Sequence, residues 1–318
     1  MKWLALMSGV WVLFASSPAW ATFSIVACDA ARTCGAAVAT NNLAVGASVI
    51  YARAGVGALA TQFETNPNYG PAGLDQMQAG GSARVVLQRL LDTDNDFDGQ
   101  DVSYRQVGLV AATGSGAAYT GKEALASGWA GTIVGEGYSV QGNGLVGPEV
   151  LAAMRDAFLA ATGPLAERLM RALEAGERSG GQSTGRMSAA LLVRTPEGGW
   201  QDVDLRIDAH STPVPELRRL YGLRQANDAL VAAERALRAG DHARAMDRVA
   251  DAARLGVGWD RVWRRIARLQ MQMGEREAAL TALGAFAGLN AAWARQETTD
   301  PLYDPVRSDP SFQAIQGG

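Results

Sequence analysis

Histidine and cysteine are scarce in this chain of 318 residues, which has two of each. His210 and His242 are too few for a multi-histidine zinc site, and they leave little material for a serine–histidine–acid triad. An excess of charge of one sign is also lacking, because the formal net charge is only −3. This balance argues against a nucleic-acid partner and against a basic surface that would bind membranes.

Long hydrophobic runs are missing as well, apart from a short one near the start of the chain. Lys2 precedes an apolar run at residues 4–15, and the next residues end at Ala21 in a small-x-small motif. This pattern predicts a signal peptide at residues 1–21. The run is short for a membrane span, so an uncleaved anchor is the weaker alternative. We therefore expect a periplasmic or secreted protein that starts at Thr22 and has no membrane attachment after cleavage.

The two cysteines, Cys28 and Cys34, flank a short segment between two stretches that favour strands. They are expected to face each other across a hairpin. In an oxidising compartment such a pair can close as a disulfide, although its short loop would give little entropic stabilisation. Two free buried thiols are the alternative, because facing positions do not guarantee bridging geometry.

The order of predicted elements is strand-rich, then helical, then strand-rich again. The predicted segments are strands within residues 22–62, helices at 70–79 and 82–91, strands within 106–119, helices at 148–161 and 164–175, and strands at 188–194 and 200–207. Strands on both sides of central helices favour two packed sheets with helices on their outer faces.

Alanine-rich helices follow residue 223, and they contain a short repeat. Residues 239–241 recur as 273–275, an offset of 34 that is typical of tetratricopeptide-like helical hairpins. We therefore predict a main domain at 22–223 and a helical domain at 224–318 that binds a protein partner. Two repeats are too few for a free-standing solenoid, so these helices should pack on the main domain or on another copy in a homo-oligomer. An ordinary helical extension is the alternative.

Blocks of the main domain carry a more specific resemblance. They are TFSIVA at 22–27, YARAGVGA at 51–58, TQ at 61–62, NP and YGP within 66–71, RQVG at 105–108, YSVQGN at 138–143, SAALLV at 188–193, and DLR with an aspartate and a histidine within 204–210. These blocks resemble the bacterial family called domain of unknown function 1028 (DUF1028). The resemblance implies the N-terminal-nucleophile (Ntn) hydrolase superfamily. It therefore implies an α+β fold, a four-layer αββα sandwich, here followed by the all-α helical-repeat extension.

In that superfamily the first residue of the mature chain attacks an amide carbon, and its own α-amino group takes the proton. The resemblance therefore implies that Thr22 is the nucleophile, exposed by removal of the signal peptide. A threonine hydroxyl needs such a base beside it. An α-amine has an unperturbed pKa of about 8, so a useful fraction is neutral at working pH. The reaction needs neither a cofactor nor a metal.

The glycine-rich segment at residues 141–144, interpreted as a loop, supplies candidates for oxyanion stabilisation and substrate binding. The Asn143 amide or the backbone N–H groups would donate to an oxyanion, and Gln141 would contact the substrate. Glycines that only shape a turn are the alternative.

Three charged or titratable side chains complete the candidate site. Arg53 is expected to lower the pKa of the amine or to hold a substrate carboxylate. Its alternative is an ion pair with an aspartate such as Asp204. Asp208 and His210 would form a polar relay at the substrate, or would cap the junction between a strand and a helix.

An acidic segment at residues 94–99 has ligand spacing like the start of a calcium loop. The twelfth position counted from Asp94 is Arg105, where an EF-hand requires a bidentate acid, so a full EF-hand is excluded. Weak calcium binding and a solvated acidic turn are the two remaining interpretations.

Two functions are consistent with these observations. The first is an exported amidohydrolase of the Ntn type that acts on a small amide or peptide. The second is a non-catalytic periplasmic protein that binds a ligand or acts as a scaffold, with the C-terminal helices as an interaction module.

Overall fold

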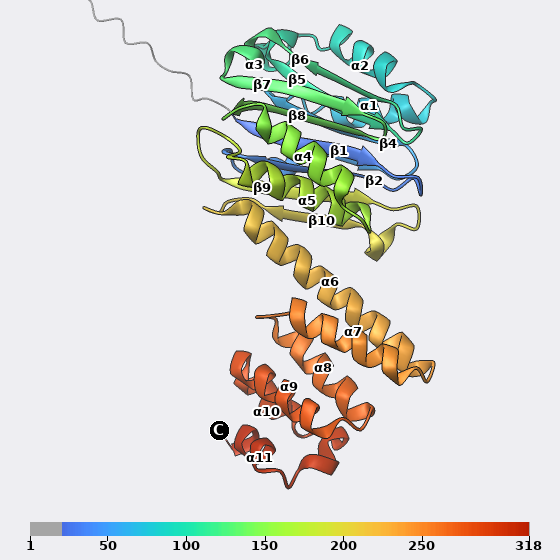
Figure 1. Ribbon diagram of the computed structural model, residues 1–318, viewed down its shortest axis with the longest axis vertical. Coiled ribbons are helices and arrows are strands. Elements are labelled where there is room, and N and C mark those ends of the chain that lie inside the picture. The colour runs from blue at the N-terminus through green and yellow to red at the C-terminus, as the bar shows by residue number, and fades with distance from the viewer. Residues whose placement is uncertain (1–20, 318) are drawn as a thin grey trace, which may run out of the picture. The chain divides into compact units, whose positions relative to one another are not determined.

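The computed structural model describes residues 21–317 (Figure 1). The predicted signal peptide lies outside the described residues, except for Ala21. The chain forms two compact units with their boundary between Leu217 and Arg218. This boundary and the one predicted after residue 223 both lie within the long helix α6 (Pro213–Arg238). Within the described residues, no helix combines the length and apolarity needed to cross a bilayer.

The first unit contains a six-stranded antiparallel sheet with β1 near its centre. Its strand order is β10-β9-β2-β1-β8-β7. The strands are β1 (Thr22–Cys28), β2 (Cys34–Thr40), β7 (Trp129–Gly135), β8 (Tyr138–Leu145), β9 (Ser188–Arg194) and β10 (Val203–Ile207). Every residue of β1, β2 and β8 is buried, so both faces of the sheet centre are covered.

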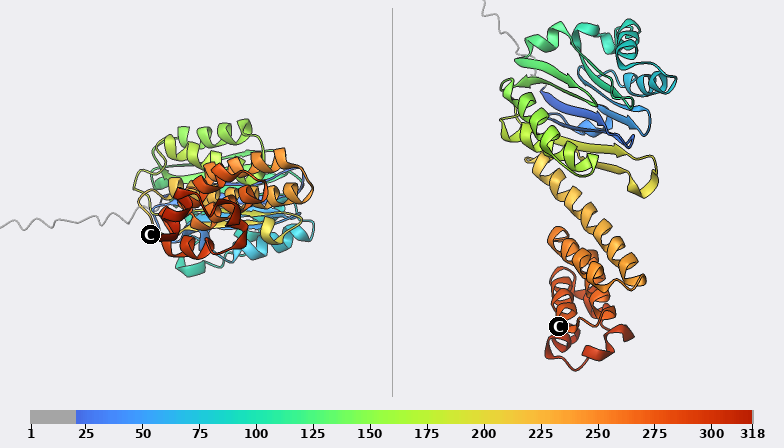
Figure 2. Two further views of the ribbon diagram at one scale, coloured as in Figure 1. Left: turned by 90° about the horizontal axis from the view of Figure 1, so that it is seen from below. Right: turned by 45° about the vertical axis from the view of Figure 1, so that its right-hand side comes forward.

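A four-stranded antiparallel sheet, in the order β3-β4-β5-β6, packs against the first. Its strands are β3 (Ile50–Arg53), β4 (Gly57–Phe63), β5 (Arg105–Ala111) and β6 (Gly116–Thr120). Helices α1 (Tyr69–Gln78) and α2 (Ala83–Asp92) pack on this sheet, and α4 (Glu149–Ala160) and α5 (Leu165–Arg178) pack on the six-stranded one. The short helix α3 (Lys122–Ala126) connects β6 to β7. Figures 1 and 2 show the two sheets between these pairs of helices.

Helix α5 shows how the sequence produces this packing. Its buried residues Leu165, Leu169, Ala172, Leu173 and Gly176 recur at helical spacing and form one apolar face. At the last of these, an added Cβ would lie 2.8 Å from Met154 Cγ of α4 and 3.1 Å from the ring of Phe23 in β1. A glycine there lets the helix approach β1 closely.

The second unit consists of helices: the rest of α6, then α7 (His242–Leu255), α8 (Asp260–Gln272), α9 (Arg276–Leu289), α10 (Ala291–Glu297) and α11 (Pro310–Gly317). Gly240 and Gly274 occupy the turns before α7 and α9 with φ of 76° and 82°, at the two positions where the repeat predicted turns. One apolar core joins residues from α6 to α11. The predicted fold class, α+β with a C-terminal all-helical region, is confirmed.

The predicted loop at residues 141–144 is wrong. These residues lie within β8, which pairs with β1 on one side and β7 on the other. An added Cβ on Gly142 would lie 2.6 Å from Leu145 Cδ1 and 3.2 Å from Leu151 Cδ2. Gly142 therefore allows close packing inside a strand, although a glycine-rich segment is by composition more typical of a turn.

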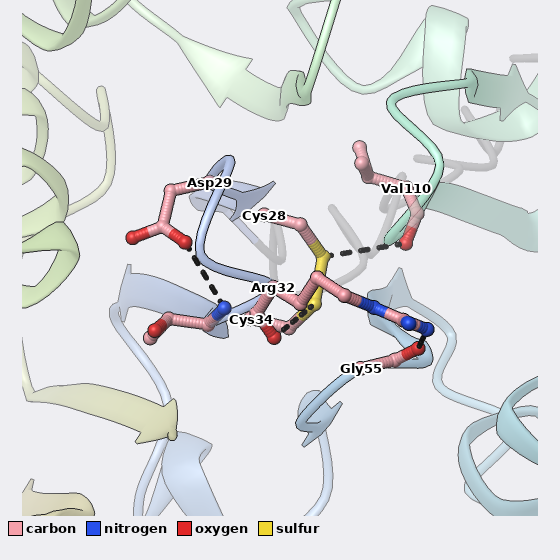
Figure 3. Close-up of a disulfide and its surroundings, with 7 residues drawn as sticks. Cys28, Asp29, Arg32, Cys34, Gly55 and Val110 are labelled. Atoms are coloured by element: carbon pink, nitrogen blue, oxygen red, sulfur yellow. Dashed lines mark hydrogen bonds between the residues drawn. A yellow bond between two sulfur atoms is a disulfide. The ribbon is translucent and has the colours of Figure 1, made fainter. Parts of the chain in front are cut away.

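Cys28 and Cys34 form a disulfide at the end of the β1–β2 hairpin, where they are directly opposite in the ladder (Figure 3). Nearby, Arg32 donates a hydrogen bond to the Gly55 carbonyl at the turn after β3. The Sγ of Cys28 lies 4.0 Å from the Val110 carbonyl oxygen. Since a disulfide sulfur carries no proton, this is a packing contact between the two sheets.

Removing the disulfide should weaken the fold moderately without disturbing the other end of β1. We expect Cys28→Ala/Cys34→Ala to lower the free energy of unfolding by about 2 kcal/mol, from the loop entropy of so short a loop. Urea unfolding of the oxidised parent and the double variant measures this. An unchanged midpoint would show that the bridge adds no stability.

Candidate functional site

Thr22 begins β1 and sits between two polar strand residues. It pairs with Thr40 of β2 and with Asn143 of β8. Its side chain is buried, and its hydroxyl lies 3.0 Å from the Thr40 hydroxyl. Thr22 and Thr40 line a pocket of ≈ 240 Å³ whose other walls come from residues 42–49 and 63–65. The first residue of the predicted mature chain thus lines a small pocket.

Three donors hold the carbonyl oxygen of Ala21, the residue just before Thr22. They are the Thr40 hydroxyl at 2.8 Å, the Gln182 side-chain amide at 2.5 Å and the Asn41 backbone N–H at 3.4 Å. A hydroxyl has one proton to donate, and that of Thr40 goes to Ala21. The Thr22 hydroxyl must therefore be the donor in its contact with Thr40.

A buried network of side-chain amides connects the two sheets beneath this site. Gln62 Nε2 lies 3.4 Å from the Thr22 carbonyl oxygen and 2.7 Å from Gln106 Oε1. Ser24 donates to Gln62 Oε1 at 2.6 Å. Sequence reasoning did not single out Ser24, Gln62 or Gln106 as site residues. The sequence signal that could have identified them is a polar residue at a core position of an otherwise apolar strand.

Asn143 lies beside Thr22, but its amide is oriented differently from the prediction. Its Nδ2 donates to Gln106 Oε1 at 2.9 Å. Its Oδ1 is buried and has no hydrogen-bond partner within residues 21–317. Directly opposite residues of an antiparallel pair have side chains on the same face. Asn143 therefore lies on the same face of the sheet as Thr22, and its unpartnered atom is an acceptor, whereas oxyanion stabilisation requires a donor.

Gln141 is not placed to bind a substrate. It is fully buried, its Nε2 donates to Ser24 Oγ at 2.6 Å, and its Oε1 accepts from Ser139 Oγ at 2.9 Å. The amide fits only because Gly108 faces it: an added Cβ there would lie 1.9 Å from Oε1. Gln141 belongs to the contact between the sheets.

Arg53 lies at the opposite end of the four-stranded sheet from the Thr22 pocket. It pairs with Gly57 at the start of β4, whereas Phe63 at the end of β4 lines the pocket. Val49, another pocket residue, comes four residues before Arg53, which is roughly 13 Å at strand rise. Its guanidinium binds Asp75 at 2.9 Å and also donates to Gln78. The structure does not bring Arg53 to Thr22, and its ion pair is made with Asp75 rather than with Asp204.

Asp208 and His210 do not form a relay. The Asp208 carboxylate binds Arg206 at 2.9 Å, and its backbone carbonyl accepts from Ala44 N in a segment next to the pocket. His210 Nδ1 accepts from Thr212 N at 3.1 Å, just before α6 begins. These contacts agree with the alternative role at the strand-to-helix junction.

The acidic segment at 94–99 serves a buried ion pair. Both oxygens of Asp94 accept from Arg105 at 3.0 Å, and Tyr69 and Asn66 also donate to Asp94. Burial by itself would raise the pKa of Asp94, but the hydrogen bonds from Arg105, Tyr69 and Asn66 outweigh it and hold this pKa below its usual value. Over residues 21–317, no group of three or more His, Cys, Asp or Glu side chains is arranged to hold a metal ion.

The Asp94→Asn change should destabilise the protein by about 3–5 kcal/mol, because it leaves the Arg105 charge buried and unpaired. Because the folded-state pKa is lowered, the stabilisation is present above the unfolded pKa of about 4 and is lost as pH falls through the folded value. Urea unfolding as a function of pH should show this dependence in the parent and not in the variant.

Asp204→Asn is the matched control, because its partner Arg194 is 2.7 Å away in a largely exposed pair. It should change stability by less than about 1 kcal/mol. If the two variants lowered the free energy of unfolding equally, the buried Asp94–Arg105 pair would contribute no more to stability than the Asp204–Arg194 pair.

Two comparisons with known proteins assign the first unit to the same family. A family model described as "Family of unknown function (DUF1028)" matches residues 22–217. The crystal structure of protein SPO2555 from Silicibacter pomeroyi, also assigned to DUF1028, is similar with 31% identity and a TM-score of 0.56. The match covers 63% of this chain and 88% of that one. No curated protein matches this chain. The matched range begins at Thr22 and spans both sheets, and the chain belongs to the DUF1028 family.

Proposed function

We propose that this protein is an exported amidohydrolase of the N-terminal-nucleophile type that acts on a small amide or peptide. The observation that carries the proposal is the position of Thr22, whose hydroxyl lies in a pocket beside the Thr40 hydroxyl. Removal of the residues before Thr22 would add an α-amine to the same residue. A nucleophile and its base would then occupy one position in the fold.

The reaction follows from these two groups. The α-amine takes the proton of the Thr22 hydroxyl as Oγ attacks the carbonyl carbon of the substrate amide. The C–N bond then breaks, and the leaving amine takes the proton from the α-ammonium. Water then attacks the resulting ester and loses a proton to the α-amine of Thr22, which passes it to the departing Oγ as the acid is released.

The surroundings of Thr22 favour this chemistry. The pocket of ≈ 240 Å³ is smaller than typical ligand sites, which favours a small substrate. The unpartnered Asn143 Oδ1 supplies an acceptor that can orient an α-amine. Thr22 is also buried in the chain that retains Ala21, so its hydrogen bonds form in a low-dielectric environment.

The experiment combines N-terminal analysis with covalent labelling. Intact mass and N-terminal sequencing of the exported protein should give a free amine at Thr22. A β-lactone probe should then acylate Thr22, at a rate that rises with pH through about 8 as the amine loses its proton. Thr22→Ala should abolish labelling and reduce amide turnover at least 10³-fold.

Thr281→Ala is the matched control, since Thr281 is exposed in the helical unit and binds only the Glu277 carbonyl. It should label like the parent. A mature chain that begins elsewhere, or a blocked amine, would contradict the proposal. Ligand binding without turnover, unchanged in Thr22→Ala, would support the non-catalytic binding protein instead.

A further inference from the structure

The Ala21 carbonyl occupies a built site for an acyl oxygen. Its donors come from separate parts of the chain: the Thr40 hydroxyl at the end of β2, the Asn41 backbone N–H, and the Gln182 amide from the segment between α5 and β9. Asn41 also holds the other side of residue 21, because its Oδ1 accepts from Ala21 N at 3.2 Å. Ala21 itself is fully buried.

The orientation of the Gln182 amide is determined by its neighbours. Its Nε2 donates to the carbonyl oxygens of Ala21 and Ala39, at 2.5 Å and 3.1 Å. The reverse orientation would place Oε1 against two acceptors. The side chain is buried, and its Oε1 has no partner among the described residues. Gln182 is thus a rigid donor whose second bond, to Ala39, does not depend on residue 21.

We propose that, once Ala21 has been removed, this three-donor site binds the acyl oxygen of the ligand. The inference deepens the proposed function and rests on it, because it requires a chain that starts at Thr22. The new α-ammonium of Thr22 would add a positive charge beside the donors. The site would then hold the carboxylate of a released acid, and the oxyanion that forms when Thr22 Oγ attacks an amide.

The buried position of Ala21 also defines the ligand class. The side chain at this residue is a single methyl group, and it is fully buried. The site would therefore accept an acyl group with a small substituent on its α-carbon, such as alanyl or acetyl. The Thr40 hydroxyl touches both this oxygen site and the Thr22 hydroxyl, so it links acyl binding to the nucleophile.

The test measures binding of N-acetyl-L-alanine, whose carboxylate reproduces the Ala21 carbonyl. Calorimetric titration should detect binding to the chain that begins at Thr22. A version that keeps residues 18–21 should not bind, because its own carbonyl occupies the site. Gln182→Met removes the amide with little change of size and should weaken binding about tenfold or more, as expected for a bond to a charged acceptor.

Ser183→Ala is the matched control. Ser183 is next to Gln182 in the chain, but its hydroxyl donates to the Gly144 carbonyl at 2.9 Å and not to Ala21. Binding by this variant should therefore stay within about twofold of the parent. If Gln182→Met does not fold, the side-chain amide resonances of Gln182 in the parent give the same test, since they should shift on titration. Equal binding by parent and variant, unshifted resonances, or no binding to the chain that begins at Thr22 would each overturn the inference.

Failure of this inference and failure of the proposed function are distinguishable. Thr22→Ala should still bind N-acetyl-L-alanine, because the three donors and the N-terminal amine remain. If the parent protein binds N-acetyl-L-alanine but is not labelled by the β-lactone at Thr22, the result would count against the nucleophile alone. Labelling at Thr22 without Gln182-dependent binding would count against the oxygen site alone.

Discussion

The antiparallel pairing of β1 with β2 and β8 is the constraint on which the site depends. This register places Thr22 between Thr40 and Asn143, and the same alternation directs Ser24 toward the four-stranded sheet. A slip of one residue would turn every one of these side chains toward the helices. The helices oppose such a slip, because Phe23 is buried against Gly176 of α5 on the other face.

The contact between the two sheets is divided between apolar and polar parts. Near the disulfide it is made of small apolar side chains such as Val26, Ala36 and Val110. Toward Thr22 it changes to the amides of Gln62, Gln106 and Gln141. Burying such amides is favourable only when they are paired, so this region tolerates few alternative arrangements. The polar part fixes the geometry near the pocket, and the apolar part supplies cohesion.

Much of the fold could be predicted from the sequence because local signals agreed with the final structure. The helices predicted at 148–161 and 164–175 correspond to α4 and α5, and the strand predicted at 188–194 corresponds to β9. Glycine misled the prediction at Gly142, where it serves close packing inside a strand. The candidate site was harder to predict than the fold. Strand pairing places Arg53 at the other end of β4 from the pocket residue Phe63, and a single sequence does not reveal that pairing. Gln182 carries no motif, and only the folded chain brings it to Ala21, 161 residues away.

The burial of Ala21 and Thr22 has a consequence for the order of events during biogenesis. In the folded chain the bond between them lies at the edge of a fully buried strand, and its carbonyl is held by three donors. A peptidase that needs an extended, accessible segment could reach this bond only before β1 enters the sheet. If a peptidase exposes Thr22 as proposed, its cleavage would therefore have to precede folding. A chain that folded before such a cleavage would keep the Ala21 carbonyl on its three donors, so the relative rates of cleavage and folding would set the fraction of molecules with a free site.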